Sequence, residues 1–507
     1  MRTWDEHLER LRAARSEASA TTPAQMQRAQ ARGRMLCRQR IGCLLDPGSF
    51  DEAGLLTNSV LPEVAAPADG LVCGVGTIDG RIVCVAADDG SVFGGARGMA
   101  AERKLRQLRL RAARDGHPFI WLQEGSGARI QEQMGATFAG AFADPFIDQV
   151  QKMSGRVPTI AALLGNCFGQ PAFVAALADF VVMTPTAFAG VSGPPIVAAA
   201  TGENVSPEEL GGHRMHAEQT GLVHHVAADE LAALAAIRIY LSYFPDHCHQ
   251  RPPARNAAAA GGDQRDLLQI VPSDLKAAYD MRQVIRVLVD QDSVFEIKPA
   301  FGPAVITAYA RIDGLPVGLI ASQPLHAGGA LDPASSDKMA SFIAVAESFQ
   351  MPLVFLQDVP GFLVGSEVER QGQVVRATHV LAALARSTTP KFTVILRKAY
   401  GLAYMVMCGY PVHPRSIVAW PTASISQMGP GPGVNVIFHR QIAAAQDPDA
   451  TRAQLGEEFE KLLDPYIAAR HGYLDDIIDP RETRTHLSNE LARAYSAWRP
   501  RPGSRPC

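Results

Sequence analysis

An internal repeat constrains this 507-residue sequence more than any other feature. The segment TIDGRIVCVAADD at residues 77–89 matches RIDGLPVGLIASQ at residues 311–323, which lies 234 positions later. The same shift superimposes Gly94-Gly95 on Gly328-Gly329, and it superimposes the lysines that follow each pair. Agreement at so many ordered positions indicates that the chain contains two copies of one domain.

Each copy contains an apolar run that leads to a glycine. VPTIAALLGNCFGQ at residues 157–170 falls on TPKFTVILRKAYGL at residues 389–402, with a slip of two positions. The apolar residues predict a buried strand, and the glycine predicts a tight corner at which a helix begins. The first backbone N–H groups of a helix have no partner within it and attract an oxyanion. We therefore expect two equivalent oxyanion-binding corners, at Gly169-Gln170 and at Leu402-Ala403.

Short apolar strands alternate with longer helical segments in each copy, which is typical of an α/β fold with crossover helices. A stretch rich in Pro, Gly and Ala separates the copies. It predicts an N-terminal domain at residues 1–245, a linker at 246–266 and a C-terminal domain at 267–507. The predicted elements of the first copy are strands at 81–87, 119–123 and 159–164, and helices at 101–115, 169–178 and 207–219.

Charge and cysteine usage exclude several classes of protein. A net charge of −3 gives no general attraction to nucleic acid or to an anionic membrane. The most membrane-like run, at residues 157–183, is interrupted by polar residues, and the charged first residues do not match a signal peptide. The eight cysteines form no C-x-x-C pair, which indicates reduced thiols, and His247-Cys248-His249 is a poor metal site without distant ligands. We expect a cytoplasmic protein without a metal site, a membrane span or a nucleic-acid partner.

Five motifs resemble the carboxyltransferase (beta) subunit of biotin-dependent acyl-CoA carboxylases, of the propionyl-CoA carboxylase type, and the resemblance runs in order from about residue 33 to about residue 438. The resemblance implies two tandem crotonase-like (ClpP/crotonase) domains related by the duplication. It also implies a homo-hexamer, in which each active site combines the first domain of one subunit with the second domain of another. The motifs are GSGARIQE (125–132), TGENVSPEELGG (201–212), QDVPGF (357–362), RKAYG (397–401) and AWPTA (419–423).

The resemblance assigns a role to each corner. In this family, carboxybiotin releases carbon dioxide, and the biotin ureido nitrogen removes the α-proton of an acyl-CoA. The resemblance implies that the amides of Gly169 and Gln170 hold the enolate oxygen, and that the amides of Leu402 and Ala403 hold the biotin oxygen. The cofactor then supplies the base, which agrees with the lack of a Ser-His-Asp, Cys-His or paired-carboxylate constellation in the sequence. Glu124 and Asp358, which are equivalent in the repeat, are interpreted as structural.

The same resemblance implies five substrate-binding residues. The coenzyme A thioester lies along the cationic helix of the first domain, where Arg103 and Lys104 are candidates for phosphate contacts. A solvated face is the alternative interpretation of that helix. Tyr400 and Gly401 belong to the second corner, and Met405 takes a position associated with the choice of acyl chain.

Two residues depart from the family pattern, because Gln170 and Leu402 stand where a second glycine is usual. If the backbone at these positions requires a positive φ, each residue costs about 1–2 kcal/mol.

The sequence also lacks the parts needed to charge biotin. It has no G-K-S/T phosphate-binding loop and no M-K-M context for a biotinylated lysine. We therefore expect separate biotin carboxylase and biotin carboxyl carrier partners (the alpha subunit). Two alternatives remain: the carboxyltransferase of a biotin-dependent acyl-CoA decarboxylase, and a non-catalytic scaffold paralogue.

Overall fold

The computed structural model describes residues 3–136 and 145–500 of the chain. It divides into two compact units, Met1–Gln250 (unit 1) and Arg251–Pro500 (unit 2), and the division lies inside the predicted 246–266 linker. On the unit 1 side, Arg81 Nε donates to Asp246 Oδ1 at 2.8 Å. On the unit 2 side, the Arg255 N–H donates to the Gly314 carbonyl at 2.9 Å. The first residue of the predicted linker is therefore bonded to unit 1, and a residue near its middle is bonded to unit 2.

Unit 1 is built around an eight-stranded sheet with the order β1-β2-β3-β4-β5-β6-β8, in which β7 pairs with β5. The β1–β2 and β2–β3 pairs are antiparallel, and the remaining pairs are parallel. The strands are β1 (Asp51–Ala53), β2 (Leu71–Ile78), β3 (Arg81–Asp88), β4 (Phe119–Gly125), β5 (Thr159–Phe168), β6 (Phe180–Met183), β7 (Phe188–Gly190) and β8 (His225–Val226). The α-helices are α1 (Trp4–Ser19), α2 (Pro23–Ala31), α3 (Cys37–Leu44), α4 (Met99–Asp115), α5 (Ile130–Gln133), α6 (Pro145–Asp148), α7 (Gln170–Ala176), α8 (Pro194–Thr201), α9 (Pro207–Gly211), α10 (His213–Met215) and α11 (Glu230–Leu241).

Unit 2 has the same architecture, with the strand order β9-β10-β11-β12-β13-β14-β16 and with β15 paired to β13. Its strands are β9 (Phe295–Ile297), β10 (Val305–Ile312), β11 (Leu315–Ser322), β12 (Leu353–Val359), β13 (Lys391–Tyr400), β14 (Ser416–Ala419), β15 (Ser424–Ser426) and β16 (Asp476–Ile477). Its α-helices are α12 (Leu267–Ile270), α13 (Met281–Leu288), α14 (Pro333–Ser348), α15 (Ser366–Arg370), α16 (Gln373–Arg386), α17 (Gly401–Val406), α18 (Pro430–Ile437), α19 (His439–Ala444), α20 (Pro448–Glu460), α21 (Pro465–Arg470) and α22 (Thr483–Ser496).

The strand registers confirm the duplication residue by residue. Cys84 pairs with Phe119 between β3 and β4, and Gly318 pairs with Leu353 between β11 and β12, at the shift of 234 positions seen in the sequence. Thr159 in β5 and Lys391 in β13 then take equivalent places beside these strands. The predicted α/β fold with two related domains is therefore confirmed, including the two-residue slip before the corners.

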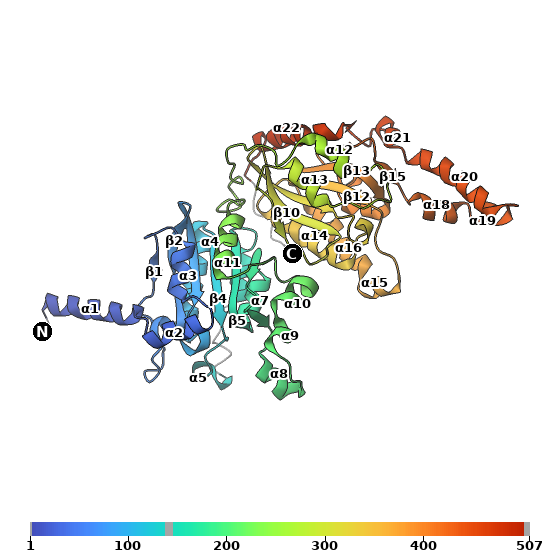
Figure 1. Cartoon of the computed structure of the whole chain (residues 1–507). Coiled ribbons are helices and arrows are strands. Elements are labelled where there is room, and N and C mark those ends of the chain that lie inside the picture. The colour runs from blue at the N-terminus through green and yellow to red at the C-terminus, as the bar shows by residue number, and fades with distance from the viewer. Residues whose placement is uncertain (1–2, 137–144, 501–507) are drawn as a thin grey trace. The chain divides into compact units, whose positions relative to one another are not determined.

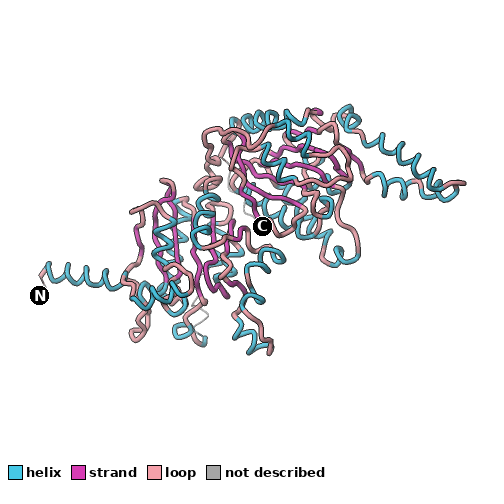
Figure 2. Tube along the Cα trace, viewed as in Figure 1, coloured by secondary structure: helices cyan, strands magenta, loops and turns pink. Residues whose placement is uncertain are grey.

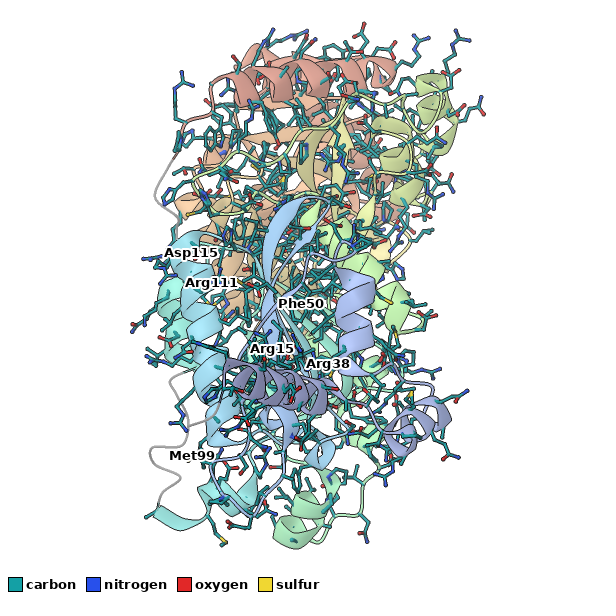
Figure 3. The ribbon with its side chains drawn as sticks, turned by 90° about the vertical axis from the view of Figure 1, so that its left-hand side faces the viewer. Arg15, Arg38, Phe50, Met99, Arg111 and Asp115 are labelled. Atoms are coloured by element: carbon teal, nitrogen blue, oxygen red, sulfur yellow. The ribbon has the colours of Figure 1, made fainter. Side chains whose placement is uncertain are left out.

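Each sheet lies between helices, as the ribbon and the tube show for each unit (Figures 1 and 2). In unit 1 the long helix α4 buries Leu105, Leu108 and Ala112 against Phe119 and Trp121 of β4. Figure 3 shows this helix from the side, running from the labelled Met99 to the labelled Asp115. In unit 2 the helices α18, α19 and α20 extend away from the sheet (Figure 1). None of the helices described is both long and apolar enough to span a membrane.

Three predicted boundaries need correction. The predicted helix at 207–219 is broken after Gly211, because the backbone of Gly212 is extended (φ −73°, ψ 166°) and forms a β-bridge with Phe188 of β7. The predicted helix at 101–115 begins two residues earlier, since α4 starts at Met99. The first corner helix is shorter than predicted, at Gln170–Ala176. The predicted strands are all present and are extended by one to four residues as β3, β4 and β5.

Candidate oxyanion sites at two strand-to-helix corners

The first corner connects β5 to α7 through Gly169, whose φ of 74° and ψ of −133° are strained for any residue with a Cβ atom. Its own N–H donates to the Gly190 carbonyl at 2.9 Å and so continues the β5–β7 pairing. The prediction that the Gly169 amide is free to hold an oxyanion is therefore wrong. Pro171 has no N–H, and the Ala172 N–H donates back to the Gly169 carbonyl at 3.0 Å. This leaves the Gln170 N–H as the unengaged donor in the first turn of α7.

The second corner connects β13 directly to α17. Gly401 has a φ of 61°, and a Cβ atom there would lie 3.1 Å from the Gln427 carbonyl oxygen. Leu402 and Ala403 occupy the first turn of α17, where backbone N–H groups lack intrahelical acceptors. The Leu402 side chain is 64% exposed, whereas the Ala403 side chain is buried. The geometry is thus compatible with two adjacent backbone donors beside an exposed side chain.

The two residues in the usual second glycine positions carry no left-handed strain. The residues with positive φ at the corners are Gly169 and Gly401, and neither Gln170 nor Leu402 has a positive φ. The cost of about 1–2 kcal/mol that would apply to a left-handed side chain is therefore absent.

The cationic helix α4 does not present its charges as a single surface. Lys104 is only 8% exposed, its Nζ donates to the Ala68 carbonyl at 2.6 Å, and burial lowers its pKa. The ammonium group of Lys104 is therefore directed to a backbone acceptor inside unit 1, and its predicted contact with a CoA phosphate stays a prediction. Arg103 is exposed and remains a candidate, while Arg106 is paired with Asp148 at 2.9 Å.

Two of the remaining predicted substrate-binding residues differ in accessibility. The Tyr400 ring is 4% exposed and packs against Val434 and Phe459, and its hydroxyl lies 2.9 Å from Ser424 Oγ. Burial raises the pKa of Tyr400. This side chain is therefore largely buried in unit 2, where it also lines the cavity described next, and its predicted contact with the substrate stays a prediction. Met405 is half-buried, one turn beyond Leu402 on α17.

A cavity of about 1080 Å³ opens beside the carboxyl end of β13 in unit 2. Lys398, Thr422 and Ser424 contribute to one side of it, and residues of α18 and α20 contribute to the other. Its lining includes Tyr400, which directly precedes the second corner, but it does not include Leu402 or Met405.

Glu124 and Asp358 have the structural role predicted for them. Glu124 accepts from Arg34 at 2.7 Å, and it is paired with the fully buried Arg40 at 2.5 Å. Asp358 accepts from Arg397 Nε at 2.8 Å and from the Lys398 N–H at 3.2 Å. Each carboxylate therefore ties its strand to neighbouring cations.

A buried charged cluster behind the first corner was missed by sequence reasoning. Asp88, Arg97 and Glu102 are 0%, 0% and 2% exposed, and Arg97 Nη2 donates to Gln170 Oε1 at 2.6 Å. The available signal was a difference between the copies, because the repeat aligns Arg97 with the apolar Leu331. In the part of the chain that the structure describes, no three His, Cys, Asp or Glu side chains are grouped to hold a metal ion.

Comparison with known proteins identifies the class. Residues 28–504 match the carboxyl transferase domain model, so the chain belongs to the carboxyl transferase family. It is 38% identical over 492 residues to the methylmalonyl-CoA carboxyltransferase 12S subunit of Propionibacterium freudenreichii, covering 95% of this chain and 93% of that protein. It is 37% identical to the biotin-dependent acetyl-/propionyl-coenzyme A carboxylase beta5 subunit of Mycobacterium tuberculosis, covering 92% and 88% of the two chains. The predicted resemblance and the predicted carboxyltransferase activity are thereby confirmed.

The fold agrees equally closely with a solved structure. A crystal structure of transcarboxylase 12S, described as a hexamer with methylmalonyl-coenzyme A and methylmalonic acid bound, superimposes with a TM-score of 0.94 at 37% identity. The match covers 100% of this chain and 99% of that chain. Both units of this chain therefore have the crotonase-like fold that the resemblance implied.

Proposed function

We propose that the chain is the carboxyltransferase subunit of an acyl-CoA carboxylase and transfers a carboxyl group from carboxybiotin to the α-carbon of an acyl-CoA. The observation that carries this proposal is the pair of equivalent strand-to-helix corners in two units of identical strand order. Such chemistry places negative charge on two oxygens, one of the thioester enolate and one of the biotin ureido group. The solved 12S structure, which is reported with methylmalonyl-coenzyme A bound, supports a CoA thioester as the substrate.

Each corner stabilises one developing oxyanion by backbone donors. The Gln170 N–H of unit 1 holds the acyl-CoA oxygen, and the Leu402 and Ala403 N–H groups of unit 2 hold the biotin oxygen. Donors of this kind are preorganised, and losing one typically lowers the rate by about 10²–10³. The first turn of α17 suits the ureido oxygen for two reasons. Its backbone N–H groups are donors without an acceptor in the helix, and the exposed Leu402 places this turn at the surface of unit 2. Biotin, when bound, supplies the carboxyl group and the base, so the protein supplies position and electrostatics.

The partners follow from what this chain does not carry. The residues suited to bind biotin are backbone amides, and the sequence has no biotinylation motif, so biotin arrives on a separate carrier charged by a biotin carboxylase. The assembly is a cytoplasmic homo-hexamer in which the acyl-CoA side of one subunit meets the biotin side of another. The hexamer described for transcarboxylase 12S supports this arrangement.

A half-reaction with free biotin tests the proposal without an identified carrier. The purified chain is incubated with malonyl-CoA or methylmalonyl-CoA, with and without biotin, and the decarboxylated acyl-CoA is measured by mass spectrometry. We expect acyl-CoA formation that depends on biotin. We also expect no carboxylation of any acyl-CoA by the chain alone with ATP and bicarbonate. Covalent biotin on this chain, or no biotin-dependent conversion of either thioester, would overturn the proposal.

Adding a carrier and a biotin carboxylase distinguishes a carboxylase from a decarboxylase. A biotinylated carrier with a biotin carboxylase and ATP should give net carboxylation of acetyl- or propionyl-CoA. If only decarboxylation of malonyl- or methylmalonyl-CoA is accelerated under those conditions, the chain acts in a decarboxylase. Gln170 and Leu402 have no positive φ, so the filled glycine positions carry no backbone strain, and a chain inactive in both assays would favour the scaffold alternative.

A further inference from the structure

The buried cluster behind the first corner is bonded along a continuous path. Arg97 Nη1 donates to Asp88 Oδ1 at 3.1 Å, and Arg97 Nε donates to Glu102 Oε1 at 2.8 Å. The Arg97 guanidinium also lies over the Trp121 ring, 4.8 Å from its centre. Although burial opposes its charge, Asp88 and Glu102 raise the pKa of Arg97. Arg97 is therefore a permanently charged and tightly fixed group.

One donor of this fixed guanidinium is directed at the corner. Arg97 Nη2 donates to Gln170 Oε1 at 2.6 Å, and Gln170 Nε2 lies 3.5 Å from Glu102 Oε2. These contacts hold the Gln170 side chain toward the interior of unit 1. The same residue supplies the unengaged N–H of the corner, so the direction of its side chain decides whether this N–H is open to a ligand.

The equivalent positions of unit 2 show which part of the cluster the fold requires. Asp88 accepts from the Glu124 N–H at 3.2 Å, and its counterpart Ser322 accepts from the Asp358 N–H at the same distance. A hydroxyl group is thus sufficient to hold the end of this strand. Leu331, Ser336 and Leu402 replace Arg97, Glu102 and Gln170 in unit 2, so the cation, its second acid and the amide are all absent together.

From this difference we infer that Arg97 is a positioning residue that acts through the Gln170 side chain. The inference rests on the proposed function, in which the Gln170 N–H holds the acyl-CoA oxygen. Arg97 retains the side chain in the interior, and the corner N–H stays accessible although the position carries a long side chain. Without the bond, the side chain rotates over the corner and competes with the acyl group. Leu402 needs no such partner, because its side chain points into solvent at the second corner.

A double-mutant cycle with biotin and malonyl-CoA or methylmalonyl-CoA tests this coupling. Arg97→Met should lower kcat by about 10–100-fold, the range expected for losing a hydrogen bond to a charged group, with little change in KM for the thioester. In a Gln170→Gly background, the same Arg97 substitution should lower kcat by no more than about 3-fold, since no side chain is left to restrain. Equal losses in the two backgrounds would overturn the inference.

Two further variants keep the test decisive. Arg97→Met leaves two buried carboxylates without their cation and can prevent folding, so Gln170→Leu serves as a second variant with similar volume and no acceptor. Gln170→Leu should reproduce the loss in kcat, and a kcat for Gln170→Leu equal to that of the unmodified protein would contradict the inference. Leu331→Met is the matched control in unit 2 and should change kcat by less than about 2-fold. An unmodified chain without biotin-dependent activity would overturn the proposed function itself, whereas an active chain with uncoupled variants would overturn only the role of Arg97.

Discussion

The two units share a strand order and a register, yet they differ in how they support their corners. In unit 1 a buried guanidinium and two carboxylates lie behind Gln170, whereas in unit 2 the equivalent residues are two serines and a leucine. The glycine that turns the chain is retained in both, with φ values of 74° and 61°. The duplication has therefore preserved the backbone of an oxyanion site and changed the side chains around it.

The largest expected effect comes from removing a donor at the second corner. Leu402→Pro deletes one backbone N–H, and we expect turnover to fall by about 10²–10³. Proline is tolerated in the first turn of a helix, so α17 should still form. Gln170→Pro should cause a loss of the same order at the first corner. Steady-state kinetics of both variants, with thermal unfolding to verify the fold, measures whether the two corners contribute equally.

Leu402→Ala is the matched control for the second corner because it shortens the side chain and keeps the N–H. Its loss should stay below about 10-fold. Full activity in a correctly assembled Leu402→Pro protein would show that this amide holds no reacting oxygen.

The next largest effect concerns the stability of unit 1. Arg109 is fully buried, all three of its side-chain nitrogens lack a hydrogen-bond partner, and burial lowers its pKa to about 10. The repeat aligns it with Ile343, a fully buried residue of unit 2. Arg109→Met should raise the free energy of unfolding by about 1–2 kcal/mol, because a desolvated, unpaired charge is replaced by an apolar chain of similar length.

Urea unfolding of the Arg109→Met protein gives the measurement, and Ile343→Met is its control. The control should cost less than about 1.5 kcal/mol, as volume-conserving apolar exchanges do. A destabilised Arg109→Met protein would mean that Arg109 gains a partner in the assembled enzyme, which would make it a second functional difference between the units.

A smaller effect is expected at Met405, which the repeat aligns with Phe173 in unit 1. Both side chains lie three residues beyond the corner residue, and so return to nearly the same face of their helices. Met405→Asp should lower kcat/KM by about 10-fold more for each methylene added to the acyl chain, because a charge meets an apolar tail. Kinetics over a chain-length series from acetyl-CoA upward provides the measurement.

Phe173→Asp tests the same question in unit 1. If Met405 reads the acyl tail, the Met405→Asp profile should steepen with chain length, and the Phe173→Asp profile shows whether the helix of the first corner, on the acyl-CoA side, does so as well. Parallel profiles for the Met405→Asp and unmodified proteins would exclude Met405 from the choice of substrate.

The sequence was sufficient to predict the duplication, the α/β class and the two corners, because these depend on local apolar runs and on glycines whose positions repeat. It was not sufficient for side-chain direction. Lys104 belongs to a helix whose sequence is rich in cationic residues, yet its ammonium group is buried and donates to the Ala68 carbonyl. The Gly169 N–H was predicted to bind a ligand, but it donates to the Gly190 carbonyl of β7 and so belongs to the sheet. Both outcomes depend on residues that only the folded chain brings together.

The smallest expected effect is a pH dependence that tests a buried lysine that both units retain. Lys338, equivalent to Lys104, is 1% exposed and donates to the Val305 carbonyl at 2.7 Å, and burial lowers its pKa to about 7. Between that value and the ordinary lysine pKa of 10.5, the unfolded chain binds more protons than the folded one, so the contribution of Lys338 to stability rises with pH. Lys338→Met should therefore reduce the slope of unfolding free energy against pH above 7, by at most about 1.4 kcal/mol per pH unit.

Urea midpoints at pH 7, 8 and 9 give this slope. The hydrogen bond lost in the Lys338→Met protein lowers the unfolding free energy by an amount that does not depend on pH, so it leaves the slope unchanged. Lys104→Met should change the slope in the same direction, because burial also lowers the pKa of Lys104. An unchanged slope in the Lys338 variant alone would mean that the two lysines, despite their equivalent places in the repeat, differ in charge inside the folded protein.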